Sequence, residues 1–221
     1  MAHHAGNTGY SADMGCIGEN QSCQNHSQGG FSNVVNGHSH TGTHMDAPAH
    51  VFAGRASLDE LPASQFVGKA TVIDCTHLGE GGSITMEQVR KNPAAEQADF
   101  LLFYTGWGKF WGKPEYFGNY PCVTNQVVDF LIQTGKKGVG LDTISLDPIA
   151  SLTLHRQLLS TNKTVIIENL NNLDKLPQGL FTFCALPLRY ENADGSPIRA
   201  VAIFLALVCC GLITTFVTKE N

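Results

Sequence analysis

The sequence lacks several features that would assign it to a common class of protein. Lys and Arg number 14 against 19 Asp and Glu, and the basic residues are scattered, so no positive stripe could neutralise the phosphates of a nucleic acid. No basic and then apolar segment opens the chain, as a signal peptide would. The seven cysteines include no C-x-x-C pair, and an odd number does not suit a disulfide framework. We therefore expect a cytoplasmic protein with no nucleic-acid partner.

Long apolar runs are also scarce. Residues 201–217 carry no charged side chain, and this length is at the short limit for a membrane-spanning helix. We expect the first part of the run to be the last core strand and the rest to pack on the domain or on another subunit. A membrane tether through residues 201–217 is the alternative. It is less favoured because a lone span would have to leave the sheet.

The chain of 221 residues is long enough for one domain with a substantial core. Residues 1–35 are rich in Gly, Asn, Ser and His and show neither a strand nor a helix period, which predicts a loop or a partly disordered segment. Residues 36–204 are expected to form the domain, and residues 205–221 an apolar C-terminal extension.

Apolar runs alternate with amphipathic segments from Phe66 onward. Helical spacing predicts helices over 83–93, 124–138 and 149–162, the first capped by Ser83 or Thr85 and the second by Thr124. Strands are predicted within the apolar runs of residues 66–78, 98–107, 138–146, 163–170, 179–190 and 196–204. The alternation predicts an α/β fold, and the consecutive late strands imply a mixed sheet.

Histidine is concentrated in one short segment, because four of the nine fall within residues 36–52. His40, His44 and Asp46 form an H-x3-H-x-D array, and His50 follows four residues later. Imidazole and carboxylate are ligands of divalent cations such as Zn²⁺, Mn²⁺ and Fe²⁺. Gly42 and the nearby Pro48 do not suit a regular helix, so we expect a turn to bring the ligands together, with Gly42 allowing either a close approach or an unusual φ.

The stretch HTGTHMDAPAH, residues 40–50, resembles the H-x-G-T-H-x-D-x-P-x-H signature of the cyclase-like metal-dependent hydrolases. That family includes bacterial kynurenine formamidase and isatin hydrolase. The resemblance covers roughly residues 36–204 and continues in LLFYTGW, GVGLDTISLD, LHRQLL, VIIENLNNL and LPLRYENADGSPIRAVAI. It implies a mixed central sheet flanked by helices, of the swivelling β/β/α type. It also implies a homodimer or larger oligomer with the pocket near a subunit interface.

The same resemblance implies a role for each candidate residue. His40, His44 and Asp46 would bind one metal, and His50 would be the catalytic acid and base. His155 and Glu168 would complete a second site that Asp46 bridges, giving one or two Zn or Mn ions per chain. Without the family, His155 on its leucine-rich helix would be a core or capping residue. Glu168 ends a buried strand, where an unpaired carboxylate is costly and a metal or cationic partner is expected.

The implied reaction is hydrolysis of a small aryl amide, foremost of N-formylkynurenine to kynurenine and formate in tryptophan catabolism. An isatin hydrolase-like cyclic amide hydrolase and a non-catalytic metal-binding relative are the alternatives. Phe52, Trp107 and Trp111 are candidates to stack on an aryl substrate, although aromatic rings are more often core residues. Residues 105–121 mix Gly, Pro and aromatics without a period, which predicts a loop over the site that acts as a lid or a dimer contact.

Overall fold

The computed structural model describes residues 22–25, 30–33, 37–205 and 212–216, which fall into two units, residues 1–38 and 39–221. In the first unit, β1 (Ser22–Asn25) and β2 (Gly30–Asn33) form an antiparallel hairpin. The prediction of an irregular N-terminal segment is therefore wrong for these two strands, where backbone pairing does not depend on an apolar alternation. The rest of residues 1–35 lies outside the described part of the chain.

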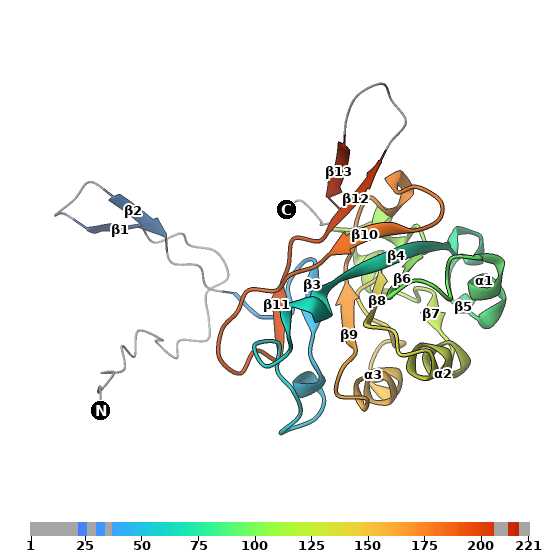
Figure 1. Cartoon of the computed structure of the whole chain (residues 1–221), viewed down its shortest axis with the longest axis horizontal. Helices are drawn as coiled ribbons and strands as arrows, with labels where there is room; N and C mark the ends of the chain where they lie inside the picture. The colour runs from blue at the N-terminus through green and yellow to red at the C-terminus, as the bar shows by residue number, and fades with distance from the viewer. Residues whose placement is uncertain (1–21, 26–29, 34–36, 206–211, 217–221) are drawn as a thin grey trace. The chain divides into compact units, whose positions relative to one another are not determined.

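One mixed sheet organises the second unit (Figure 1). Among the described residues it has nine strands, in the order β11 (Gly195–Pro197), β3 (His44–Asp46), β9 (Val165–Glu168), β8 (Gly138–Leu141), β6 (Phe100–Tyr104), β4 (Val67–Asp74), β10 (Phe181–Cys184), β12 (Val201–Leu205) and β13 (Leu212–Phe216). The central strands β4, β6, β8 and β9 are parallel, and the strands on either side pair antiparallel. The predicted α/β fold with a mixed sheet is confirmed.

Three α-helices accompany the sheet in the described part of the chain: α1 (Met86–Lys91), α2 (Asn125–Gln133) and α3 (Thr153–Leu159). The predicted Thr85 cap is present, because its hydroxyl accepts from the amide of Glu87 and the Gln88 side chain accepts from the amide of Thr85. Thr124 precedes α2 without a capping hydrogen bond. The remaining short elements are β5 (Ser83–Ile84), β7 (Cys122–Val123) and the 3-10 helices η1 (Pro48–His50), η2 (Ala63–Phe66), η3 (Thr76–Leu78), η4 (Trp107–Phe110), η5 (Pro114–Phe117) and η6 (Leu173–Lys175).

The central strands are buried on both faces, which explains why β6 reads as an unbroken apolar run. Phe100 and Leu102 pack on one face with residues of β10 and of the loop after β9. Leu101 and Phe103 pack on the other face with apolar side chains of α2 and α3, which lie side by side in Figure 1. Two hydrophobic clusters therefore hold the sheet from its two sides.

The pairing of β3 with β9 brings distant parts of the sequence together. These strands are antiparallel, and His44 lies opposite Glu168 in their register. Strand β9 is in turn parallel to β8, so the segments that follow β8 and β9 leave the sheet at the same edge. The H-x3-H-x-D segment thus lies at the carboxyl end of the parallel strands, where α/β proteins commonly bind ligands.

The late apolar run forms sheet structure. Strand β12 pairs with β10, and β13 pairs with β12 from Val201–Phe216 to Leu205–Leu212. The first part of residues 201–217 is a strand of the sheet, as predicted, but it is not the last one, because β13 follows it in the same run and pairs with it at the edge of the sheet. Within the described residues, we find no helix with the length and apolar character that crossing a bilayer requires.

Lys136 ties the loop before β6 to the start of β8. Its side chain is buried, and Nζ donates to the carbonyls of Ala95 at 2.8 Å, Glu96 at 2.7 Å and Ala98 at 2.7 Å. Burial lowers the pKa of Lys136, so the ammonium depends on these carbonyls for the solvation that it loses on folding.

We predict that Lys136→Met lowers the free energy of unfolding by about 2–4 kcal/mol, because it removes hydrogen bonds from a charged donor and leaves buried carbonyls without a partner. Urea unfolding followed by circular dichroism measures the change. Lys91→Met is the matched control. It removes an exposed ion pair with Glu87 at 2.6 Å, and such pairs contribute little to stability. Equal losses in the two variants would show that Lys136 has no special structural role.

Candidate metal centre

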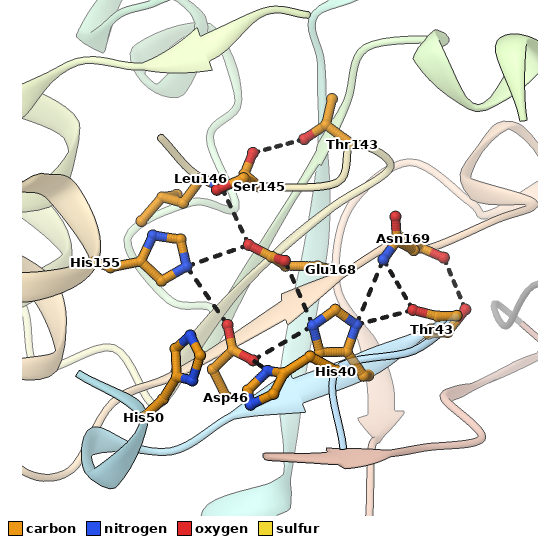
Figure 2. A network of polar contacts seen from close by, with 12 residues as sticks. His40, Thr43, Asp46, His50, Thr143, Ser145, Leu146, His155, Glu168 and Asn169 are labelled. Carbon is orange, nitrogen blue, oxygen red and sulfur yellow. Dashed lines mark hydrogen bonds and ion pairs between the residues drawn. The ribbon is translucent and has the colours of Figure 1, made fainter. Parts of the chain in front are cut away.

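Two buried carboxylates and a set of imidazoles converge where β3 meets β9. Figure 2 shows Asp46, Glu168 and His155 pointing toward one another, with the ring of His50 beside Asp46. Asp46 is 1% exposed and Glu168 is 5% exposed. Carboxylates buried to this extent require partners of opposite charge or a bound cation.

Asp46 lies between the histidines. Its Oδ1 is 2.7 Å from Nδ1 of His40 and 3.4 Å from Nε2 of His44. Its Oδ2 is 3.5 Å from Nε2 of His155. The two oxygens of one carboxylate therefore face different histidines, as the implied bridging role of Asp46 requires.

Glu168 faces the same histidines from the end of β9. Its Oε2 is 3.5 Å from Nε2 of His44, and its Oε1 is 3.3 Å from Nε2 of His155. Oε1 also accepts a hydrogen bond from the amide of Leu146 at 3.2 Å. The structure thus brings together the residues for which the resemblance implied metal binding: His40, His44, Asp46, His155 and Glu168.

The local backbone explains how His44 is oriented. Gly42 has φ of 62°, a left-handed conformation, which is the second of the two roles expected for this glycine. The Nδ1–H of His44 donates to the Gly42 carbonyl at 2.9 Å. A carbonyl can only accept, so the proton is on Nδ1, and Nε2 is left as the ligand atom facing Asp46 and Glu168.

His155 is oriented by Asp147, which the sequence analysis did not single out. Oδ2 of Asp147 accepts from Nδ1 of His155 at 2.7 Å and from its amide at 2.8 Å. Oδ1 accepts from the amide of Leu154 at 2.8 Å. Asp147 therefore satisfies the first amides of α3 and directs Nε2 of His155 at the two buried carboxylates. An acidic residue just before a predicted helix was the available signal.

His40 is held by Asp194 and Gly195, which were also missed. Nε2 of His40 lies 3.0 Å from Oδ2 of Asp194, whose Oδ1 accepts from the Ser39 hydroxyl at 3.1 Å. A Cβ on Gly195 would lie 2.4 Å from Cε1 of His40, so only glycine leaves room for this ring. Both residues arrive through the pairing of β11 with β3, which no local pattern could indicate.

His50 ends the 3-10 helix η1 at the border of the site. Its ring centroid is 4.0 Å from that of His40, and its Nδ1 is 3.6 Å from Oδ2 of Asp194. Burial lowers the pKa of His50, and together with the positive charges of His40 and His155 it outweighs the opposing effects of Asp46 and Asp194. His50 is therefore neutral at neutral pH, the state in which an imidazole accepts a proton.

The other three histidines of the site, His40, His44 and His155, have raised pKa values. Burial opposes their protonation, but the hydrogen bonds and charges of Asp46 and Asp194 outweigh it and raise the pKa of His40 to about 9. Asp147, Asp46 and Glu168 likewise outweigh burial and raise the pKa of His155 to about 11. The pKa of His44 is raised in the same way by Asp46 and Glu168. These protons compete with a divalent cation, because a histidine must be neutral to bind metal.

The donor set fits a borderline divalent metal. Two groups, His40–Asp46–His50 and His44–Asp46–Glu168, each offer ligand atoms within 4.8 Å of one another, and Asp46 belongs to both. Imidazole nitrogens with carboxylate oxygens, in a buried place that lacks a Lys or Arg to balance the charge among its described contacts, are typical of Zn or Mn sites.

A cavity of about 370 Å³ opens over this cluster. It is lined by His40, Thr41, Gly42, His44, Asp46, His50, Trp111, Tyr116, Phe117, Ile144, Ser145, Leu152, His155, Glu168 and Asn169. One side is polar and carries the metal-binding candidates. The other is formed by apolar and aromatic side chains from the segment 105–121 and from the loop between β8 and α3.

Of the aromatic residues predicted to contact substrate, only Trp111 lines the cavity. Trp107 is a core residue instead, because its ring is 6% exposed and its Nε1 donates to the carbonyl of Tyr116 at 3.0 Å. Phe52 packs at the edge of the core, where the guanidinium groups of Arg55 and Arg156 lie 5.7 and 5.5 Å from its ring. The geometry does not support substrate contacts for Trp107 and Phe52. The first is buried, and the second packs against the core outside the cavity.

Comparison with known proteins identifies the class of this fold and site. Residues 6–148 match the model of the family described as putative cyclase, which is more than half of the chain, so the chain belongs to this family. The predicted membership of the cyclase-like hydrolases is confirmed.

Individual relatives agree with this assignment. The chain is 34% identical over 165 residues to kynurenine formamidase of Bacillus cereus, covering 73% of this chain and 75% of the relative. It is 37% identical over 175 residues to an uncharacterized protein of Methanocaldococcus jannaschii, covering 78% and 82%. An isatin hydrolase bound to the product analogue thioisatinate has a TM-score of 0.67 at 25% identity, covering 83% and 80%. Isatin hydrolase A from Labrenzia aggregata bound to benzyl benzoate has a TM-score of 0.63 at 28% identity, covering 78% and 75%.

We predict that the wild-type protein retains stoichiometric Zn or Mn after gel filtration and that His44→Ala loses most of it, because the variant removes the Nε2 atom between the two buried carboxylates. Elemental analysis measures the metal per chain. His77→Ala, at an exposed histidine outside the cavity, should retain wild-type content. Circular dichroism confirms that each variant is folded. A folded wild type without stoichiometric metal would contradict the assignment of this site.

We predict that the stability of the metal-free protein falls as the pH rises, while the additional stability given by metal increases. The raised pKa values of His40, about 9, and His155, about 11, stabilise the metal-free fold fully below their ordinary pKa of about 6.5. That contribution is lost as the pH rises through the folded values. The melting temperature of chelator-treated protein should therefore fall from pH 6.5 to pH 9. The increment from added Zn²⁺ should grow over the same range. Parallel profiles would refute the prediction.

Proposed function

We propose that this protein hydrolyses a small aryl amide with the help of a divalent metal, and that its first candidate reaction is conversion of N-formylkynurenine to kynurenine and formate. The observation that carries the proposal is the position of His50. It combines a lowered pKa with a place in the cavity, beside the cluster of Asp46, His44, His155 and Glu168. The relationship to kynurenine formamidase of Bacillus cereus supports this choice of substrate.

The side chains present would divide the work as follows. A Zn or Mn ion bound by His40, His44 and Asp46, with His155 and Glu168 at a second position, would supply a Lewis acid for the amide carbonyl. His50 accepts the proton of the attacking water and returns a proton to the departing amine. Asp194, 3.6 Å from Nδ1 of His50, lies where it can stabilise the imidazolium that forms between these two steps. Trp111 and Phe117 line the cavity where an aryl group would lie.

A cyclic amide of the isatin type is the second candidate, and one observation favours it. None of the described residues that line the cavity is Lys or Arg. N-formylkynurenine carries an α-carboxylate, which a cationic side chain normally recognises. Isatin carries no charge, and its flat ring suits the apolar wall. The isatin hydrolases of similar fold support this alternative. A metal-binding protein without catalysis is the remaining possibility within the family.

Two further features belong to this proposal. The formamidase reaction would place the protein in tryptophan catabolism. We also propose a homodimer or larger oligomer, with the cavity near a subunit interface. The exposed Phe117, at 59%, and Leu152, at 47%, border the cavity and support that arrangement, because large apolar side chains at a rim favour association or ligand contact.

We predict that the metal-loaded wild type turns over one of the two substrates and that His50→Asn lowers its kcat by about 10²–10⁴-fold, the usual contribution of a positioned acid and base. Absorbance assays follow the formation of kynurenine and the opening of isatin. Wild-type metal content in His50→Asn is expected for an acid and base, whereas a loss of metal would make His50 a ligand, as its place in the group His40–Asp46–His50 would allow. His77→Asn should leave kcat unchanged. Preference for isatin would select the second candidate. Stoichiometric metal with turnover of neither substrate would show a non-catalytic relative.

A further inference from the structure

Tyr116 belongs to the aromatic segment 105–121, yet its hydroxyl points away from that segment. The side chain is 1% exposed and lines the cavity. Its hydroxyl donates to Oδ1 of Asn169 at 2.5 Å. A buried tyrosine hydroxyl normally finds a partner, but this partner directly follows the metal-ligand candidate Glu168.

Asn169 connects the two segments that carry the metal ligands. It adopts φ of 58°, a left-handed conformation that asparagine tolerates better than other residues with a Cβ. Its Nδ2 donates to the carbonyl of Gly42 at 2.9 Å, and its own carbonyl accepts from the Thr43 hydroxyl at 2.7 Å. These bonds also assign the amide, because the Gly42 carbonyl can face only the nitrogen and leaves Oδ1 for Tyr116.

The Gly42 carbonyl is the acceptor that orients His44. It receives Nδ1–H of His44 at 2.9 Å as well as the Asn169 amide. A continuous series of hydrogen bonds therefore runs from the Tyr116 hydroxyl through Asn169 to Gly42 and ends at the ring whose Nε2 faces Asp46 and Glu168. Figure 2 shows Asn169 between Thr43 and Glu168 at this end of the network.

The ring of Tyr116 has a separate packing role. It lies 5.0 Å from the ring of Trp111 in an edge-to-face arrangement, and its backbone carbonyl accepts from Trp107. These contacts hold the aromatic segment together and do not involve the phenolic oxygen. A phenylalanine would keep these ring and backbone contacts and would lose the hydroxyl, with its bond to Asn169 at 2.5 Å and its longer contact with the carbonyl of Asp142 at 3.4 Å.

We propose that Tyr116 is a positioning residue whose hydroxyl, through Asn169 and Gly42, fixes the orientation of His44 and so couples the aromatic wall of the cavity to the metal centre. This inference rests on the proposed metal-dependent function of the site. It also assigns the segment 105–121 a fixed place: Asp142 holds its first residue, Thr105, by bonds of 2.9 Å and 2.6 Å, and Asn169 holds its middle. These bonds make the segment 105–121 a fixed wall of the cavity and not a free lid.

The test uses Tyr116→Phe in the full chain, with Co²⁺ as the probe metal. Removal of a partner that orients a metal ligand typically weakens metal binding by about 10–100-fold. We expect a loss of this size in Co²⁺ affinity, measured by competition with a chelator, together with an altered visible spectrum of bound Co²⁺. In turnover, kcat should fall with little change in KM, because the wall that contacts substrate is retained. Asn169→Gly, which keeps the left-handed backbone and deletes the amide, should give the same changes.

Tyr104→Phe is the matched control, since it makes the same chemical change at a residue that does not line the cavity. Its Co²⁺ affinity and spectrum should equal those of the wild type. If Tyr116→Phe has the affinity and spectrum of the wild type, the inference is overturned and Tyr116 has a packing role alone. A wild type that binds no Co²⁺ would also overturn it. A wild type that binds Co²⁺ but hydrolyses neither amide would contradict the proposed reaction, while a spectral change in Tyr116→Phe would still support the positioning role.

Discussion

The constraint on which the rest of this structure depends is the burial of Asp46 and Glu168 side by side. Two carboxylates in a place of low dielectric repel each other, and each has lost most of its water. The cost is visible in Glu168, whose pKa is raised by burial and by the charge of Asp46. In the absence of metal, protonated imidazoles balance part of this negative charge. A divalent cation would balance it with two positive charges at one point. The buried pair of carboxylates therefore favours the binding of a cation at this place.

The residues that orient the histidines can be explained by the same pair of buried carboxylates. Asp147 and the Gly42 carbonyl each take one nitrogen of a histidine and leave the other facing the carboxylates. Asp194, the residue just before β11, does so for His40. Without such partners each ring could turn, and a ligand that rotates freely loses conformational entropy when it binds. Strands β3 and β9 and helix α3 carry most of the candidate ligands, and the residues around them fix the orientation of the rings.

Sequence reasoning found those parts of the molecule that carry a local signal. The helices and central strands have a period or an unbroken apolar run, and the histidine segment has a spacing that suits metal binding. The pairing of Glu168 and His155 with that segment came only through the family resemblance, because their contact is made by strand order. Asp194 and Gly195 were missed for the same reason: they reach His40 only through the pairing of β11 with β3. For Trp107 and Phe52 the sequence prediction assigned too much. Composition cannot distinguish an aromatic ring that lines a cavity from one that packs in or against the core.

The register of β3 against β9 also bears on how the protein reaches its folded state. His44 and Glu168 become neighbours only when a strand near the start of the domain pairs with one that is synthesised much later. Glu168 lies outside the segment that holds His40, His44 and Asp46, so a cation bound between His44 and Glu168 would recognise the paired strands and not the unfolded chain. Its binding free energy is then added to the closure of a long loop, the step of folding that loses the most chain entropy. A cation bound there would therefore stabilise the folded domain by the free energy with which it binds the paired strands.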